Sequence, residues 1–410
     1  MSTRRRPGGA AAAVVVTAAF VSALVAPSSA VAAQMPDYPT WQDVQNARKS
    51  EAATRAEISQ IEGILVQLEA QAAELGKVAQ QKAEVAAQAQ DALDAATKKL
   101  AALKKQAQKA QDDADESAQR ATILISQLAR TGGGDVTLGL MLGGSAKDTD
   151  KLLSRLGSMN KLTESSAAIL QQAVFDRNQA QSLADDATAA EKVRKKLAKA
   201  ATDAATVAQA ASDEAAAEVA AQEVAATQMY AQLASLKGTT SATEAAYQEG
   251  LTEAQEAAQN APPPPASTPP SGVDPSPPAP VAGAVAQSIA YARAQLGEPY
   301  AFGGAGPSSW DCSGLTKMSY ASAGVYIGTH SVSNQYATMR SQGRLVSIGS
   351  LAPGDLLFYA SGGSTSGGFY HVAMYVGGGQ MIEAPRPGVS VRIVSVRYGD
   401  LVPYAGRPTG

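Results

Sequence analysis

A seven-residue repeat of apolar residues runs through the first half of this chain and constrains its fold more than any other feature. The repeat starts at Ile58 and continues to Leu128. Leucine, isoleucine and alanine fill two positions of each heptad, and Lys82 and Ser117 are the polar exceptions. Sustained heptads of this kind are typical of coiled coils. A helix this long, roughly 100 Å at 1.5 Å per residue, needs a partner helix to bury its apolar seam.

The partner helix is expected from the same chain. The sequence TGGG at 131–134 interrupts the helical pattern, which resumes over 147–237. An antiparallel hairpin is therefore predicted. The region around its turn, near 131–160, is rich in leucine and methionine. Such residues either form a small cap that packs on itself or, taken together, suggest a head that binds another protein.

The first 33 residues are typical of an export signal. Three arginines at positions 4–6 precede an apolar run over 10–26, and small residues at 30–33 suit cleavage by a signal peptidase. We expect residues 1–33 to be removed and the mature protein to be secreted, outside the cytoplasm in the cell-wall space. An uncleaved anchor is the alternative, although the run is at the short limit for a membrane span.

Changes in composition divide the rest of the chain into three parts. Residues 34–260 consist mainly of strong helix formers, and we interpret them as a coiled-coil regulatory domain. Residues 261–283 begin APPPPASTPP and are expected to form an extended, semi-rigid linker. Glycine, tyrosine, valine and isoleucine become common in 284–410, which predicts a globular domain.

Charge is distributed unevenly between these parts. The whole chain carries a formal net charge of −3, whereas its last 126 residues hold eight basic and five acidic residues. The helical region is therefore acidic and the globular domain mildly basic. This difference suggests that the coiled coil docks electrostatically on the domain and restrains it, a form of autoinhibition. Nucleic acid is not expected as a partner, because the sequence has no dense basic patch or aromatic platform.

The chain contains one cysteine, Cys312, in the sequence SSWDCSGL. An exported protein with a single cysteine has no internal disulfide framework, so the thiol is structural, intermolecular or reactive. Asp311 is a plausible helix N-cap, with a helix expected over 312–323. Cys312 would lie in the first turn, where the helix dipole lowers a thiol pKa, while the adjacent Asp311 would raise it.

The sequence around the second of two histidines predicts a β-hairpin. His371 begins the alternating segment YHVAMYV, and QMIEAP follows a loop of three glycines at 377–379. If Val376 pairs with Gln380, then His371 and Glu383 lie on the same face of the hairpin as near-diagonal neighbours.

A cysteine, a histidine and a carboxylate form a possible nucleophile, base and orienting group. Cys312, His371 and Glu383 supply these three types. We interpret His330 as a loop or pocket residue. Zinc bound by the cysteine and both histidines is the alternative, but these ligands lack the short spacing of zinc sites, so no metal and no cofactor is expected.

Three segments together resemble the NlpC/P60 family of peptidoglycan cysteine endopeptidases, which has a papain-like α+β fold. They are EPYAFGGAGPSSWDCSGL, GDLLFY at 354–359 and HVAMYVGGGQMIEAP. The resemblance covers about 285–406. It implies a secreted peptidoglycan hydrolase, a thiol protease that acts on stem peptides of the cell wall.

The resemblance also implies roles for individual residues. Cys312 would be the nucleophile, His371 the general base and Glu383 the residue that orients the imidazole. Tyr300 would help to stabilise the oxyanion, and Asp311 and Ser313 would contact the substrate peptide. The third position is often histidine in this family, and Glu383 is similar instead to the Rip-type branch of actinobacterial cell-separation hydrolases.

The order of the parts is also similar to cell-separation hydrolases that the division complex FtsE–FtsX controls. By that resemblance, the coiled-coil head would bind such a membrane complex during cell division. The enzyme would be a D,L-endopeptidase that cuts between D-isoglutamate and meso-diaminopimelate. The alternative is a noncatalytic adaptor in which a degenerate domain binds the cell wall. The complete set of Cys312, His371, Glu383 and Tyr300 favours the enzyme.

Overall fold

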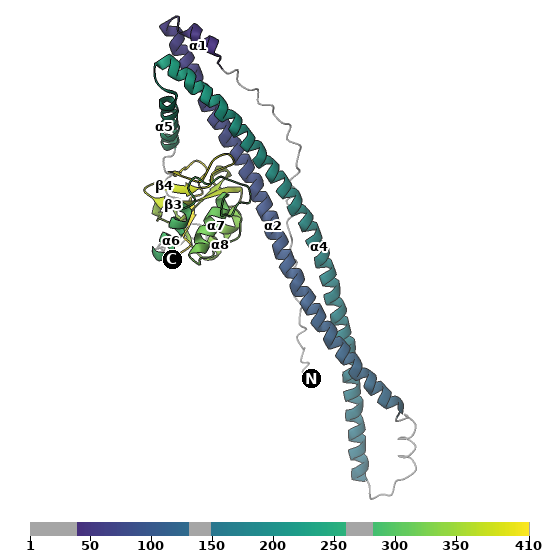
Figure 1. The fold of residues 1–410 in the computed structure, drawn as a ribbon. Helices are drawn as coiled ribbons and strands as arrows, with labels where there is room; N and C mark the ends of the chain where they lie inside the picture. Colours follow the sequence, from purple (N-terminus) through teal and green to yellow (C-terminus); the bar gives the residue numbers. More distant parts are fainter. Residues whose placement is uncertain (1–38, 131–148, 260–281, 410) are drawn as a thin grey trace, which may run out of the picture. The chain divides into compact units, whose positions relative to one another are not determined.

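The computed structural model of the protein describes residues 39–130, 149–259 and 282–409 (Figure 1). The predicted export signal, the predicted linker up to residue 281 and residues 131–148 of the predicted head lie outside the described residues. The described chain begins with long helices and ends with a domain of mixed helices and strands. This order confirms the predicted fold class, an all-α coiled coil followed by an α+β domain.

Two long helices form the coiled coil. The helices of this region are α1 (Trp41–Ala47), α2 (Glu51–Arg130), α4 (Thr149–Lys237) and α5 (Ser241–Gln259). Helices α2 and α4 pack side by side (Figure 1). Lys237 donates to Glu62 at 2.8 Å and Lys104 donates to Glu191 at 3.2 Å. Because partner numbers fall along α4 as they rise along α2, the two helices are antiparallel, as predicted.

The apolar seam of α2 is buried where the heptads predict it. Its buried members are Ile61, Leu65, Leu68, Ala72, Ala79, Ala86, Leu100, Ala110, Ala114 and Ala121. Ser117, a polar exception, is also buried, and its hydroxyl donates to Asp176 of α4. Gln80 and Glu84 are buried as well, although neither belongs to the seam. Their burial therefore has another cause, which lies in the C-terminal domain.

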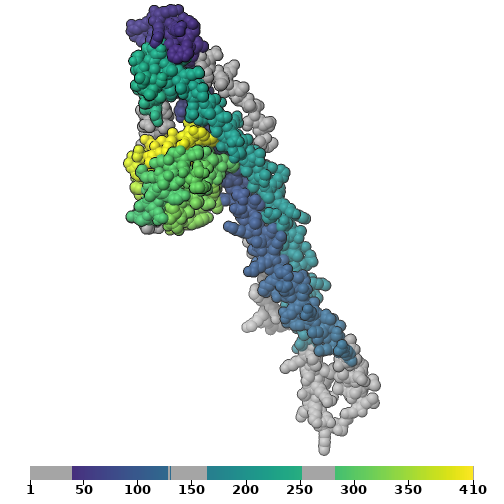
Figure 2. Space-filling model, in the orientation of Figure 1, coloured from purple at the N-terminus to yellow at the C-terminus, as the bar shows by residue number. Residues whose placement is uncertain are grey.

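The C-terminal domain packs three helices against an antiparallel sheet. The helices are α6 (Ala282–Arg293), α7 (Cys312–Ser322) and α8 (Val332–Ser341). The strands are β1 (Leu345–Ser347), β2 (Leu356–Ala360), β3 (Phe369–Gly377), β4 (Gln380–Glu383), β5 (Arg392–Ser395) and β6 (Tyr404–Gly406), and the 3₁₀ turns are η1 (Ile348–Ser350) and η2 (Ser361–Gly363). The sheet order is β1-β6-β2-β3-β4-β5. In the space-filling view these elements form one continuous body (Figure 2).

Both faces of the sheet are buried. Each strand places alternate residues on opposite faces, so residues of one strand belong to two apolar clusters. Val372 and Met374 of β3 belong to the apolar cluster that also contains Leu315 of α7. Ala373, between them, belongs to a second cluster. His371 shares the alternation of Ala373, so it lies on the face opposite Val372. No helix among the described residues combines the length and apolarity needed to cross a bilayer.

The predicted β-hairpin has the expected register, with one difference at its turn. Met374 pairs with Ile382 and Tyr375 with Met381, which is the predicted alignment. A bulge then shifts the last pair to Gly377 and Gln380, so the loop has two residues rather than three. Gly378 and Gly379 both have positive φ, 64° and 75°. A two-residue turn between antiparallel strands favours this backbone conformation, which glycine adopts without strain.

Candidate active site

The N-terminus of α7 holds the cysteine as the sequence predicts. Helix α7 begins at Cys312, and the side chain of Asp311 caps it by accepting from the Gly314 N–H at 2.7 Å. Cys312 is a free cysteine with 6% of its surface exposed. Val372, the residue after His371, donates a backbone hydrogen bond to the thiol. The thiol on α7 is thereby placed against β3, the strand that carries His371.

The surroundings of Cys312 favour the thiol over the thiolate. Burial raises the Cys312 pKa most, and the charges of Asp311 and Glu84 raise it further. Backbone hydrogen bonds from Val372 and Ser313 lower it, but the net pKa lies well above the ordinary value. The sequence indicated the opposing effects of the helix N-terminus and Asp311. It did not anticipate the burial or Glu84, which belongs to α2.

His371 and Glu383 meet as the predicted hairpin requires. The Nε2 atom of His371 lies 2.8 Å from Oε2 of Glu383, and the two side chains are 1% and 0% exposed. Burial lowers the His371 pKa, and the charges of Arg397 and Arg392 add to this, while Glu383 raises it; the net pKa is below the ordinary value. His371 is therefore neutral at pH 7, with Nε2 directed to Glu383 and Nδ1 on the opposite side of the ring.

The carboxylate of Glu383 has two arginine partners that sequence reasoning missed. Arg397 donates to Oε1 at 2.8 Å and to Oε2 at 2.7 Å, and Arg392 donates to Oε1 at 3.3 Å. Burial alone would raise the Glu383 pKa, but Arg397 and then His371 outweigh it and hold the pKa well below its usual range. Glu383 is thus ionised although it is fully buried.

Asp311 organises the other side of the site. Its Oδ1 atom accepts from Ser313 Oγ at 3.1 Å and lies 2.7 Å from Nε2 of His330, while Oδ2 accepts from the Gly303 N–H at 3.0 Å. Burial lowers the His330 pKa, but the hydrogen bond and charge of Asp311 raise it, for a net rise. His330 therefore lies in the pocket, bound to Asp311 and apart from the pair on β3 and β4.

A pocket of about 520 Å³ lies beside Cys312 and Asp311, and its lining does not include His371 or Glu383. Tyr300, Asp311, Cys312, Ser313 and His330 line it from the C-terminal domain. Burial raises the Tyr300 pKa well above its ordinary value, helped by the charges of Asp311 and Cys312, so the phenol keeps its proton. The structure therefore brings the predicted nucleophile together with Tyr300, Asp311 and Ser313. The predicted base, His371, is outside the pocket lining, and the residue after it, Val372, donates its backbone N–H to the thiol.

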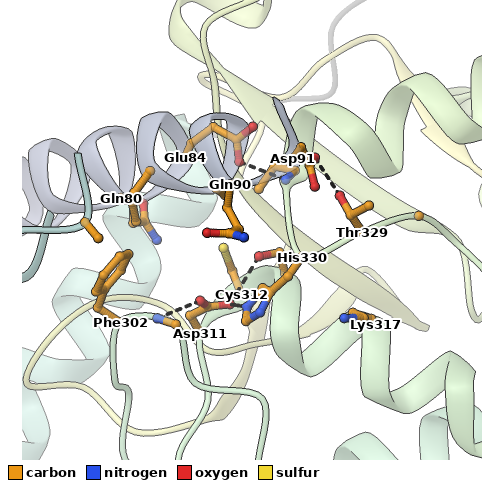
Figure 3. Close-up of a pocket in the computed structure, with 18 of the residues that line it drawn as sticks. Gln80, Glu84, Gln90, Asp91, Phe302, Asp311, Cys312, Lys317, Thr329 and His330 are labelled. Atoms are coloured by element: carbon orange, nitrogen blue, oxygen red, sulfur yellow. Dashed lines mark hydrogen bonds and ion pairs between the residues drawn. The ribbon is translucent and has the colours of Figure 1, made fainter. Parts of the chain in front are cut away.

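Helix α2 of the coiled coil lines the other side of this pocket (Figure 3). Glu84 accepts from Ser331 Oγ at 2.9 Å, from the Val332 N–H at 2.8 Å and from the Ser333 N–H at 3.0 Å. Its carboxylate thus caps the N-terminus of α8, where free N–H groups and the helix dipole favour an anion. These donors explain how an acidic side chain of a coiled coil is 4% exposed.

Gln80, one turn before Glu84, contacts the histidine itself. Its Nε2 atom lies 2.9 Å from Nδ1 of His371 and also donates to the Pro385 carbonyl. With Nε2 of the imidazole directed to Glu383, Nδ1 holds the lone pair that would accept a proton from a thiol. The amide of Gln80 occupies that lone pair, so α2 engages the basic nitrogen directly.

Helix α2 makes further contacts with the C-terminal domain besides those of Gln80 and Glu84. Arg386 pairs with Glu69 at 3.0 Å, and Lys77 pairs with Asp400 at 2.6 Å. Gly76 lies directly against Arg386, since a Cβ built on this glycine would lie 2.9 Å from Cβ of Arg386 and closer to its Cδ. We expected acidic residues of the coiled coil to pair with basic residues of the domain. Glu69 and Arg386 pair in this way, whereas Lys77 and Asp400 pair with the charges reversed.

Comparisons with known proteins point to one family for this domain. Residues 297–401 match the model of the NlpC/P60 family. The peptidoglycan endopeptidase RipA of Mycobacterium tuberculosis is 36% identical over 132 residues, which are 29% of this chain and 26% of RipA. The probable endopeptidase p60 of Listeria grayi is 40% identical over 102 residues, 25% of this chain and 18% of that protein.

A solved structure is also similar to part of this chain. The peptidoglycan hydrolase RipB of Mycobacterium tuberculosis is 32% identical, and the match covers 35% of this chain and 73% of that one, with a TM-score of 0.28. This chain spans about a quarter or less of the length of RipA and p60.

The burial and raised pKa of Cys312 predict slow alkylation of the native chain. At pH 8 we expect iodoacetamide to modify the folded protein at least about 10-fold more slowly than the unfolded protein, because each unit of pKa removes a factor of ten in thiolate. Cys312 is the only thiol, so mass spectrometry reports on this site alone. The unfolded chain, which should take up one equivalent, is the control. Equal rates in the two states would contradict a protected thiol.

Proposed function

We propose, from the membership of residues 297–401 in the NlpC/P60 family, that this protein is a peptidoglycan endopeptidase that uses Cys312 as its nucleophile. The single observation that carries the proposal is the pairing of His371 with Glu383, on the strand whose Val372 N–H binds the thiol of Cys312 at the start of α7. A nucleophile, a base and a group that orients the base are the parts needed for acyl transfer through a thioester.

The chemistry follows from the two nitrogens of His371. Nε2 is bound to Glu383, which leaves Nδ1 to act as the base. Nδ1 takes the proton of the Cys312 thiol as Sγ attacks the peptide carbonyl carbon. The same nitrogen returns the proton to the leaving amine, and the C–N bond breaks to give a thioester. Water then attacks the thioester, with Nδ1 as the base, and the thiol reforms. The Cys312 N–H and the Tyr300 hydroxyl stabilise the oxyanion in both steps.

The substrate we propose is a stem peptide of the cell wall, cut between D-isoglutamate and meso-diaminopimelate. The family assignment supports this substrate class. Asp311 and Ser313 line the pocket beside Cys312 and supply polar contacts for a peptide. We also propose that residues 1–33 direct secretion, that residues 34–260 and 284–410 act as regulatory and catalytic domains, and that a membrane complex of the FtsE–FtsX type binds the head. The tip of that head, at 131–148, lies outside the described residues.

Replacement of the nucleophile tests the proposal directly. We expect residues 282–410 to release muropeptides from peptidoglycan and Cys312→Ala to abolish this release, because no other thiol is present. Mass spectrometry of the products identifies the bond that is cut. Circular dichroism confirms that the variant is folded. Full activity in folded Cys312→Ala protein would rule out the mechanism, and products cut at another bond would change the proposed substrate.

The two histidines are expected to differ. His371→Ala should reduce kcat by about 10³-fold or more, because both proton transfers use this side chain. His330→Ala removes a partner of Asp311 and should mainly raise KM or lower stability. Steady-state kinetics of the isolated domain measures both effects. A kcat for His330→Ala as low as that of His371→Ala would contradict the assignment of the base.

We propose further that α2 holds the enzyme inactive. Three of its contacts support this regulation: Gln80 occupies Nδ1 of His371, Glu84 caps α8 inside the pocket, and α2 forms one wall of the pocket around Cys312. Release of α2 would free the basic nitrogen, open the pocket to substrate and remove the Glu84 charge that raises the Cys312 pKa. One movement would therefore activate the base and the nucleophile together.

A glycine in α2 allows a sharp test of this regulation. Gly76→Ala places a methyl group against Cβ of Arg386, and overpacking of this kind costs about 1–3 kcal/mol. If the docked state dominates, hydrolysis by the chain from residue 34 should rise about 5- to 100-fold, and alkylation of Cys312 should accelerate in parallel.

Gly63→Ala is the matched control. Gly63 lies in the same helix, but a Cβ there meets nothing within 4 Å. Both substitutions should strengthen the helix by about 1 kcal/mol, so a difference between them isolates the contact with Arg386. Equal hydrolysis and equal alkylation rates for the two variants would remove the case for autoinhibition by α2.

A further inference from the structure

We propose that Arg397 is a positioning residue for the reaction, and that it acts by holding the Glu383 carboxylate in one plane with one oxygen directed at His371. The inference rests on the proposed function, since it concerns how the proposed base is oriented. Arg397 follows β5 in the chain and belongs to no strand or helix.

The hydrogen bonds around Glu383 support a specific geometric role. Arg397 makes a fork in which one nitrogen donates to each carboxylate oxygen, at 2.8 and 2.7 Å. The same Oε2 atom lies 2.8 Å from Nε2 of His371. A glutamate carboxylate otherwise rotates freely about its last torsion. A planar guanidinium that binds both oxygens fixes this rotation, so the acceptor for Nε2 is held in place.

The burial of Glu383 requires this partner as well. An ionised carboxylate with no exposed surface is stable only when charged donors satisfy it. Arg392 contributes a single hydrogen bond of 3.3 Å from a side chain that is 39% exposed. Arg397 contributes two shorter bonds from a side chain that is 28% exposed. Arg397 is therefore the stronger of the two partners.

Tyr359 links the arginine to the imidazole. The guanidinium carbon of Arg397 lies 5.4 Å from the centre of the Tyr359 ring, and the His371 ring centre lies 5.5 Å from the same ring. Tyr359 pairs with His371 across β2 and β3 and is 2% exposed. The Tyr359 ring thus lies beside both Arg397 and His371, and Glu383 hydrogen-bonds to both of them.

The charge of Arg397 also reaches His371. The charged groups that act on His371 are Glu383 on β4, Arg392 on β5 and Arg397 just after β5. The ring of Tyr359 on β2 lies beside the imidazole, and α2 supplies the uncharged Gln80. Burial lowers the His371 pKa most, and among the charges Arg397 lowers it most. Removing Arg397 should therefore raise this pKa, and the imidazolium should form at higher pH.

Two substitutions separate the charge of Arg397 from its fork. Arg397→Gln removes both, so we expect kcat to fall at least about 10-fold. The fall should be smaller than the ~10⁴-fold loss seen when the orienting carboxylate of a Ser–His–Asp triad is made neutral. KM should stay near the parental value, and the acid limb of the pH–kcat profile should move to higher pH. Arg397→Lys keeps the charge but donates from one point, so its acid limb should stay near the parental pH while kcat falls.

The readouts are chosen so that the two proposals can fail separately. Histidine-selective ¹⁵N NMR of the chain from residue 34 measures the His371 pKa without any substrate, and His330→Ala assigns the two signals. Hydrolysis by the same chain measures kcat. If neither this chain nor its Gly76→Ala variant, in which α2 is released, cuts peptidoglycan, the proposed function fails, while a raised His371 pKa in Arg397→Gln still supports the positioning role.

Arg392→Gln is the matched control, because it removes an arginine from the same carboxylate but leaves the fork. Its effects on kcat and on the His371 pKa should be smaller than those of Arg397→Gln. The inference is overturned if folded Arg397→Gln keeps both the parental kcat and the parental His371 pKa, or if Arg392→Gln has the larger effect. Should Arg397→Gln not fold, a parental kcat in Arg397→Lys overturns it.

Discussion

The cost of burying a carboxylate controls both the proposed catalytic pair and its restraint. Glu383 and Glu84 are 0% and 4% exposed, and each is stable only because donors surround it. Arginines and an imidazole from the same domain supply the donors for Glu383. The N-terminus of α8 supplies those for Glu84, which comes from the coiled coil. The partners of Glu383 thus belong to its own domain, whereas Glu84 takes its partners from a domain other than its own.

Helix α2 contacts α4 through one face and the C-terminal domain through another. Its apolar seam packs against α4 and excludes water from the space between the two helices. The face that carries Gly76, Gln80 and Glu84 is polar, and its atoms pair with particular groups of the domain. Buried polar atoms favour one register, since a shift of a single turn would leave them without partners. The docked position is therefore specific.

The sequence predicted those parts of the site that depend on neighbours along the chain. The N-cap at Asp311 and the start of α7 at Cys312 follow from local helix signals. The meeting of His371 with Glu383 follows from alternation across one hairpin. The heptads predicted which face of α2 is buried against α4. These features are short-range or periodic, so a single sequence contains them.

The missed residues are those whose partners are distant or irregular. Arg397 lies after the last regular pair of β5, where no period says which way a side chain points. Gln80 and Glu84 occupy polar positions of a heptad helix, which usually face solvent, and their partners are about 250 to 300 residues away. Only the fold of the other domain reveals that these positions are covered.

Net charge indicated that the two parts attract each other, but the contacts show a different balance of forces. Glu69 with Arg386 has the expected polarity, and Lys77 with Asp400 has the reverse. Partly exposed ion pairs contribute about 0–1 kcal/mol each, so neither pair decides whether the coiled coil docks. The hydrogen bonds of Gln80 and Glu84 and the close contact at Gly76 carry more of the specificity.

A restraint made of such contacts suits a tethered enzyme. If residues 261–283 form the expected linker, they tether the domain to the coiled coil, so docking needs only modest affinity. A shift from a mostly docked to a mostly released population then requires about 5.5 kcal/mol of differential binding energy. A protein partner that bends or separates α2 and α4 could provide this without contacting the catalytic domain. Because α2 carries both the apolar seam and the polar face, a change in how the seam packs would displace Gln80 and Glu84 together.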